Sequence, residues 1–220
     1  MRDTAAQPLE DEAGLTLIEL LISMIIFSVV IALSYAALIN VQRQTSDTVA
    51  RADATGNARL ALQQIDRQVR SGNVLYSPSA EIIPGATGAE QCQASTDATR
   101  PNAGTCMRVY TQANGVEKCV QWQVQSVTQV LRVRSWSPAW VTDGQVSDWS
   151  TVARSVTNTS ATPAFALASG TQYGSRLMDL SLLVKNPTAR GNAIDVSSSL
   201  SGRNTAYGFD PGVCTPIPPA

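Results

Sequence analysis

One acidic residue lies within an otherwise uncharged, apolar stretch near the start of the chain. The stretch runs from Leu15 to Ile39, 25 residues, and Glu19 carries its only charge. An unpaired carboxylate in hydrocarbon is costly, and a cationic partner offsets that cost. Cleavage after Gly14 would create such a cation, because the new α-amino group of Leu15 could neutralise the Glu19 carboxylate of a neighbouring copy. The chemistry indicated is therefore proteolysis followed by ion pairing inside an apolar helix bundle.

The element that positions Glu19 is a helix long enough to cross a membrane. At 1.5 Å per residue the apolar stretch would be about 38 Å long, whereas a bilayer core of about 30 Å needs about 20 residues. Ser23, Ser28 and Ser34 are compatible with such a span, because a helical serine can donate to a carbonyl one turn earlier.

Two other interpretations of this segment compete. A secretory signal peptide could be cleaved before Ala37, after the small residues of Ser34-Tyr35-Ala36. The apolar run is longer than such peptides use, and the residues before it are acidic where basic ones are expected. A plain signal anchor is the second alternative, but it leaves the charge of Glu19 without a partner.

The block Gly14-Leu15-Thr16-Leu17-Ile18-Glu19-Leu20-Leu21 closely resembles the type IV prepilin signature. This resemblance implies that prepilin peptidase cuts after Gly14 and that Leu15 becomes N-methylated. It also implies that Glu19, the fifth mature residue, guides docking into a growing filament. Leu15 departs from the family, which usually has Phe or Met there. The acidic leader gives little help with orientation, so the direction, with the globular domain outside the inner membrane, comes from the resemblance.

A second block, Ala58–Gly72, resembles J-type minor pseudopilins and PilW-like minor pilins. The resemblance implies a structural minor subunit in the initiating or tip complex of a type IV pilus or a type II secretion-like filament. Its partners would be prepilin peptidase, other pilin or pseudopilin subunits and an inner-membrane assembly platform. A pilus, a secretion pseudopilus and a DNA-uptake fibre all stay open.

Helical periodicity continues beyond the apolar stretch. No proline occurs between Leu15 and Ser71; Gly56 is a point where the helix could bend, and Gly72 is a candidate C-cap. The expected organisation is a leader at 1–14, a transmembrane and filament-core helix at 15–39, an amphipathic continuation at 40–72 and a β-rich extracytoplasmic domain at 73–220.

The rest of the chain predicts short strands, giving an α+β fold in which the helix packs on an antiparallel meander. Asn114-Gly115 predicts a two-residue hairpin turn, which pairs Met107 with Trp122 and Val109 with Val120. The expected extended pieces are 74–76, 82–83, 107–112, 116–125, 129–136, 177–185 and 195–200, with a surface loop at 85–105.

Four cysteines, Cys92, Cys106, Cys119 and Cys214, all follow the apolar stretch and lack CxxC spacing. An even number on one side of a membrane segment favours two disulfides in an oxidising compartment. In the expected register Cys106 and Cys119 lie about 13 Å apart, too far to bond directly. Of the three connectivities we favour Cys92–Cys106, closing the 85–105 loop, with Cys119–Cys214 holding the tail.

The composition argues against an enzyme. The chain has no histidine, which removes the commonest general base and the commonest metal ligand. We expect no catalytic residue, cofactor or metal, and we interpret Asp179 and Asp195 as loop or strand-end carboxylates. With 16 basic and 17 acidic residues, the charge balance gives no strong attraction to nucleic acid.

One alternative function is a filament-carried binding module, such as an adhesin or a DNA-uptake subunit. Arg132 and Arg134 alternate on one predicted strand, with Trp136, Trp140 and Trp149 nearby. Basic and aromatic side chains together can bind single-stranded nucleic acid. The simpler interpretation is a solvated strand face, with the tryptophans packed in the core or under loops.

Overall fold

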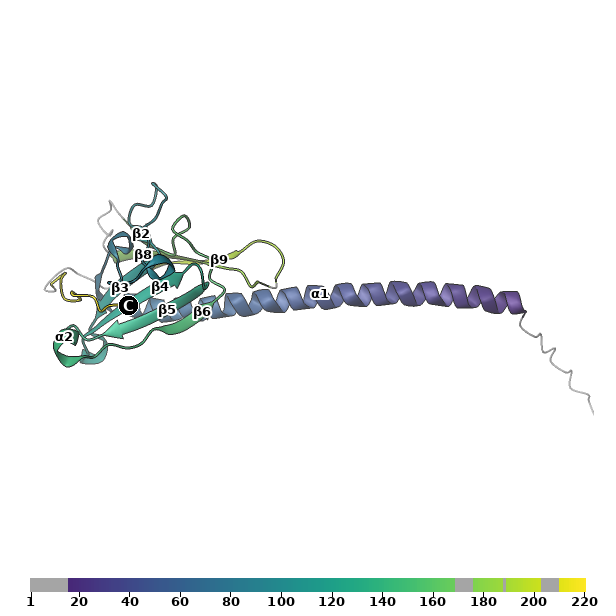
Figure 1. Ribbon diagram of the computed structural model, residues 1–220, viewed down its shortest axis with the longest axis horizontal. Helices are drawn as coiled ribbons and strands as arrows, with labels where there is room; N and C mark the ends of the chain where they lie inside the picture. The colour runs from purple at the N-terminus through teal and green to yellow at the C-terminus, as the bar shows by residue number, and fades with distance from the viewer. Residues whose placement is uncertain (1–15, 169–175, 188, 203–209) are drawn as a thin grey trace, which may run out of the picture. The chain divides into compact units, whose positions relative to one another are not determined.

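The computed structural model describes residues 16–168, 176–187, 189–202 and 210–220. The chain divides into two compact units, Met1–Ser46 and Asp47–Ala220, which are taken separately below. The long helix α1, Leu17–Arg70, contributes to both units (Figure 1). Its first half belongs to unit 1, and its second half is the only long helix among the described residues of unit 2.

Helix α1 is continuous for reasons visible in the sequence. It contains no proline, and helical structure passes through Gly56 without a break. The three serines of the apolar segment donate to backbone carbonyls within the helix, Ser23 to Glu19, Ser28 to Ile25 and Ser34 to Val30, at 2.7–2.8 Å. These hydroxyls therefore need no external partner, as the sequence predicted.

The second half of α1 packs on the sheets through a narrow stripe of small and aliphatic side chains. Its buried residues are Ala54, Ala58, Ala61, Ile65 and Val69. They recur every three or four positions, so they line one helix face. The alanines let the sheets approach closely, and most of the remaining positions are polar, although Val49 and Leu60 are exposed.

The first sheet is antiparallel, with the strand order β1-β3-β4-β5-β6. Its strands are β1 (Gly72–Leu75), β3 (Cys106–Thr111), β4 (Lys118–Gln125), β5 (Val130–Trp136) and β6 (Ser150–Arg154). Met107 pairs with Trp122 and Val109 with Val120, which confirms the predicted register. The turn was predicted wrongly: pairing stops at Thr111 and Lys118, and the connection contains a 3-10 turn, η3 (Ala113–Gly115).

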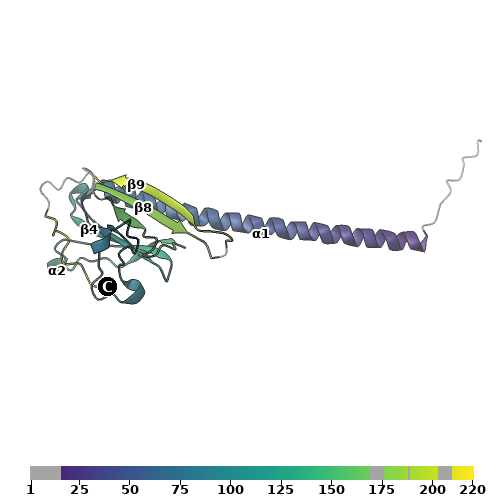
Figure 2. The same ribbon diagram turned by 90° about the horizontal axis from the view of Figure 1, so that it is seen from above.

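The second sheet is also antiparallel, with the order β2-β7-β8-β9. It comprises β2 (Ala103–Gly104), β7 (Phe165–Leu167), β8 (Leu177–Val184) and β9 (Ile194–Ser201). Figure 2 shows β8 and β9 running along the second half of α1. The α+β class is confirmed, but the single meander is wrong because the strands divide between two sheets. The missed strands β2 and β7 have two and three residues, too few to show alternation. The five residues of β6, STVAR, do not alternate between polar and apolar.

Three short helical turns complete the described elements: η1 (Pro78–Ala80), η2 (Gly88–Glu90) and α2 (Trp140–Asp143). Residues 82–83, expected to be extended, form no strand. Their backbone instead serves the first sheet, since the carbonyl of Ile82 accepts a hydrogen bond from the Gln121 side chain at 2.9 Å.

One core fills the space between α1 and the inner faces of both sheets. Trp122 is fully buried there, and its indole N–H donates to Gln68 of α1 at 2.7 Å. Gly72 is not a helix cap as expected; it begins β1. A Cβ at this position would lie 2.7 Å from Cγ1 of Val109, so close packing explains the glycine.

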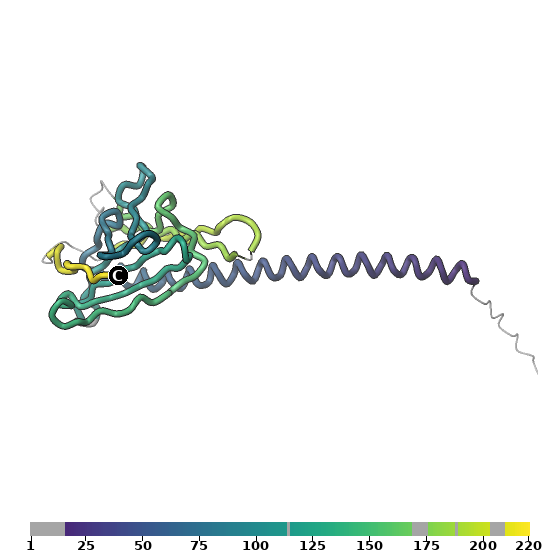
Figure 3. The backbone as a smooth tube through the Cα atoms, viewed as in Figure 1, coloured from purple at the N-terminus to yellow at the C-terminus, as the bar shows by residue number. Residues whose placement is uncertain are grey.

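Two disulfides join Cys92 to Cys106 and Cys119 to Cys214, the two pairs that the sequence favoured. The first closes the 93–105 loop. The second attaches the C-terminal tail to β4, 95 residues away in sequence. The tail lies beside the first sheet (Figure 3).

Candidate functional site

The apolar segment of α1 exposes its side chains within the chain. Residues 16–46 include large exposed side chains such as Ile18, Phe27 and Leu33. By length and composition, α1 is the one helix among the described residues that could cross a membrane, and none of its most apolar 18-residue window is buried. This surface therefore needs a lipid or protein partner from outside the chain.

Glu19 lies in the first turn of α1 and is exposed. Its amide N–H donates to the Thr16 carbonyl at 3.1 Å and to the Thr16 hydroxyl at 3.4 Å. A carboxylate in the first turn interacts favourably with the helix dipole. Within residues 16–168 and the other described ranges, its side chain forms no ion pair. Gly14 and Leu15, the predicted cleavage and methylation site, lie outside the described residues.

Several arginine and tryptophan residues of the alternative hypothesis lie together, but Arg134 and Trp136 are buried, while Arg132 and Trp149 are partly exposed. Arg134 is 3% exposed, and its guanidinium donates to the carbonyls of Pro218 and Pro219 in the tail. Arg132 lies over the Trp149 ring, 4.3 Å from its centre, and donates to Gln123 at 2.7 Å. The predicted basic surface and the predicted solvated face are therefore both wrong for Arg134.

Arg134 lies on the face of the first sheet that carries Arg108 and Gln121. This face is buried because the 78–105 segment and the C-terminal tail, residues 210–220, cover it. Arg108 donates to Glu81 at 3.1 Å and to the Cys214 carbonyl at 2.8 Å. Gln121 connects Glu81 to Arg134. Its side-chain NH2 group donates to Glu81 at 3.1 Å, and its side-chain carbonyl oxygen accepts from Arg134 at 2.9–3.0 Å. We call Glu81, Arg108, Gln121 and Arg134 the buried polar network.

Burial shifts the acid–base behaviour of this network. It raises the pKa of Glu81 above its usual 4.5, against the opposing charge of Arg108. It lowers the pKa of Arg134 to about 10, with a further contribution from the like charge of Arg132. Arg134 therefore stays cationic at neutral pH. The network stabilises the fold by binding tail carbonyls, and it leaves Arg134 unable to meet an external ligand without displacing the tail.

Sequence reasoning missed the buried polar network. A usable signal was present in the register, because Gln121 lies opposite Arg134 and Gln123 opposite Arg132 on the paired strands β4 and β5. Uncharged amides placed beside arginines can satisfy guanidinium donors without water.

The two carboxylates that the sequence singled out each accept a hydrogen bond from a serine on the neighbouring strand. Asp179 on β8 accepts from the Ser199 hydroxyl at 2.6 Å, and Asp195 on β9 accepts from Ser181 at 2.9 Å. No cluster of metal-ligating side chains occurs in the part of the chain that the structure describes.

Comparison with known families gives one result. Residues 11–35 match the prokaryotic N-terminal methylation motif. The match supports a type IV pilin-like protein, and the motif implies processing by prepilin peptidase and assembly with other pilins. Together with the apolar helix it fits a membrane-anchored pilin. No curated protein and no solved structure matches the chain.

Proposed function

We propose that this chain is a structural minor subunit of a pilus-like filament, held in the inner membrane before assembly. The observation that carries the proposal is Glu19: a single carboxylate in the first turn of an apolar helix, within a methylation motif. Cleavage after Gly14 frees the amine of Leu15. The amine and the carboxylate of neighbouring subunits then pair as the helices bundle, so neither charge is left alone in an apolar surrounding.

Three features support a minor rather than a major subunit. The mature chain would have 206 residues, 220 minus 14, which is long for a major pilin. Its domain contains irregular loops, among them the disulfide-closed 93–105 segment. The 58–72 block resembles the J and PilW types. This resemblance places the proposed subunit in the initiating or tip complex. Because Glu19 is present and can pair with the amine of another subunit, we place it beneath a neighbour in that complex.

The role we propose is assembly, without catalysis or a cofactor. Pilin-like proteins are structural subunits, and no nucleophile with an adjacent base can be named among the described residues. The globular domain would lie outside the membrane, and later in the pilus or pseudopilus. The binding-module alternative loses its main support because Arg134 is buried under the tail.

The proposal is tested by Glu19→Ala in cells of the source organism. We expect the variant to remain in the membrane but to enter sheared filaments at least about tenfold less, since leaving one partner of a buried ion pair alone costs ~3–5 kcal/mol. Immunoblots of the filament and membrane fractions measure the ratio.

Asp47→Ala is the matched control, because Asp47 lies on the same helix beyond the apolar stretch and should leave incorporation unchanged. Normal incorporation of Glu19→Ala would contradict the pairing mechanism.

A further inference from the structure

The four outer edges of the two sheets are not alike. β1 and β6 each carry a register irregularity, and β2 has two residues. β9 is the exception, with eight residues paired to β8 without interruption from Ile194 to Ser201. It carries no proline, and Asp195 is its only charged residue. Proteins usually bend, shorten or charge such edges, because a regular free edge recruits another strand.

The backbone groups at this edge can be assigned from the ladder. On β8, Ser181 and Leu183 direct their N–H groups away from β9, toward Ala164 and Asn158. In an antiparallel pair such residues alternate with those bonded to the other neighbour. The β9 residues whose N–H and C=O groups point to the free edge are therefore Asp195, Ser197, Ser199 and Ser201. None of these backbone groups has a partner among the described residues.

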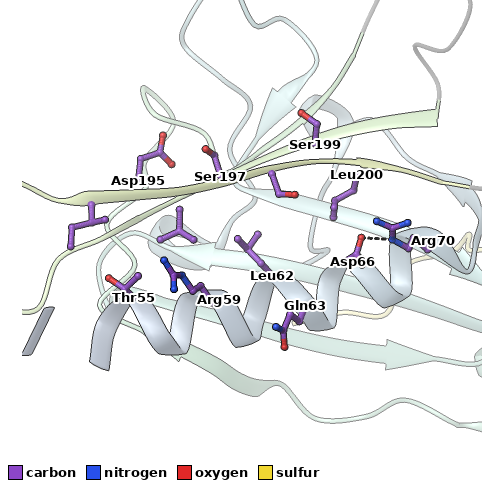
Figure 4. A pocket seen from close by; sticks show the side chains of 13 residues that line it. Thr55, Arg59, Leu62, Gln63, Asp66, Arg70, Asp195, Ser197, Ser199 and Leu200 are labelled. Atoms are coloured by element: carbon purple, nitrogen blue, oxygen red, sulfur yellow. Dashed lines mark hydrogen bonds and ion pairs between the residues drawn. The ribbon is translucent and has the colours of Figure 1, made fainter. Parts of the chain in front are cut away.

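A groove of about 600 Å³ lies between this edge and the second half of α1 (Figure 4). Its apolar lining comes from Leu62 on the helix and from Ile194, Val196 and Leu200 on the strand. Ile194 and Val196 are only partly buried. A strand added beside β9 could place every second side chain over these residues, as happens when a peptide extends a sheet.

The charged side chains that line the groove indicate which charge a bound segment should carry. On the helix wall, Arg70 is neutralised by Asp66 at 2.6 Å, whereas Arg59 forms no ion pair with any described residue. Figure 4 shows Arg59 reaching from α1 toward β9. The carboxylate of Asp195 is held by Ser181 through a cross-strand hydrogen bond. Asp195 keeps its negative charge, but Figure 4 shows its side chain pointing away from α1. On the helix wall, the charge that has no ion-pair partner among the described residues is therefore positive.

We infer that β9 and this groove bind an extended segment of another protein, added as a fifth strand and carrying a carboxylate opposite Arg59. The segment alternates apolar and polar residues, because one of its faces must cover Leu62 and Val196. This inference rests on the geometry of unit 2 and does not depend on the proposed filament role.

The test uses the full chain in detergent micelles and three nine-residue peptides that alternate valine with threonine. Two differ only in a central glutamate or lysine, and the third is the glutamate peptide with alternate backbone amides methylated. Hydrogen exchange of residues 194–201 reports binding. We expect the glutamate peptide to slow exchange there and to bind about threefold more tightly than the lysine peptide, as for an exposed ion pair. The methylated peptide should not bind.

Matched variants separate the two parts of the inference. Arg59→Ala should remove the preference for glutamate, while Arg67→Ala, on the same helix but outside the groove, should keep it. Ser197→Pro removes one donor at the free edge, where proline is tolerated, and should weaken binding about fivefold. Ser197→Ala removes only the hydroxyl and should bind normally.

Two results would overturn the inference: no slowing of exchange at β9 by any peptide at 1 mM (~20 times a weak Kd of about 50 μM), or equal binding of the methylated and unmethylated peptides. The peptide comparison stands even if Ser197→Pro fails to fold, because it leaves the protein unchanged.

Discussion

The two units of this chain differ in which side chains they expose to solvent and which they bury. Unit 1 exposes large apolar side chains along α1, and Ile18, for example, is 67% exposed. Unit 2 buries even charged and amide side chains, so that Glu81, Arg108 and Arg134 are each less than 8% exposed. The difference shows where each unit finds its partners. The buried charged groups of unit 2 are bonded within its own chain, whereas the exposed apolar side chains of unit 1 need lipid or other subunits.

Mutations in the two units should therefore affect different properties of the protein. Changes in unit 2 should alter folding stability, because its interactions are intramolecular. Changes in unit 1 should alter membrane retention or assembly and leave the unfolding of the domain as it was. The following predictions test this division, from the largest expected effect to the smallest.

The largest effect is expected from removing the tail disulfide by the double change Cys119→Ser and Cys214→Ser. The bond closes a loop of 95 residues, and chain entropy predicts a loss of about 4–5 kcal/mol in the free energy of unfolding. Urea unfolding of the full chain in detergent, followed by tryptophan fluorescence, measures the loss.

Removing Cys92–Cys106 is the control, since its separation of 14 residues predicts a smaller loss of about 3 kcal/mol. A larger loss for the shorter loop would argue that the tail is not held mainly through Cys214.

A second prediction makes the same substitution in each unit. Ile65→Ala should lower the free energy of unfolding by about 2–5 kcal/mol, because Ile65 is fully buried in the core and the change leaves a cavity. Ile25→Ala should leave that quantity unchanged, because Ile25 is 60% exposed within the chain. Urea titrations of both variants under identical conditions give the comparison; similar losses would contradict the division into two units.

The smallest effect concerns pH and Glu81. Because burial raises the pKa of this carboxyl in the folded state, the protonated form favours folding. The stability that this pKa shift of Glu81 contributes is therefore fully present below the pKa of the carboxyl in the unfolded state. It is lost as the pH rises through the pKa of the carboxyl in the folded state.

The difference in unfolding free energy between wild type and Glu81→Gln, measured at several pH values from 4 upward (about the unfolded pKa of Glu), should change in that direction. Wild type should lose stability relative to the variant as the pH rises. A difference that stays constant with pH would show that Glu81 does not titrate differently in the two states.

Local patterns in the sequence predicted those parts of the fold that depend on neighbouring residues. Alternation around Asn114-Gly115 predicted the register of β3 and β4, since a shift of one residue would move Met107 and Trp122 out of the core. The turn itself was predicted wrongly, because strand pairing ends earlier than the alternation suggests. The Gly14–Leu21 block lies within residues 11–35, which match the N-terminal methylation motif, and its role in assembly stays a prediction.

Apart from the Cys119–Cys214 pair, which the sequence favoured, features that depend on distant segments could not be predicted in this way. Alternation on β5 shows that Arg134 lies opposite the apolar face, but it does not show that residues of the 78–105 segment and the tail cover that side. The groove beside β9 has the same origin, because its two walls, at Arg59 and Val196, are 137 residues apart in the sequence. The two-residue strand β2 has too short a sequence pattern to be recognised, and it is defined by its pairing with β7.

The mature N-terminus of the protein recovered from filaments tests the central claim most directly. Intact mass and N-terminal peptide mass spectrometry should find a chain that begins at Leu15 and carries one added methyl group. A filament-borne chain that still contains residues 1–14, or one that begins at Ala37, would contradict the account, because no amine would then be available at Leu15 to pair with Glu19.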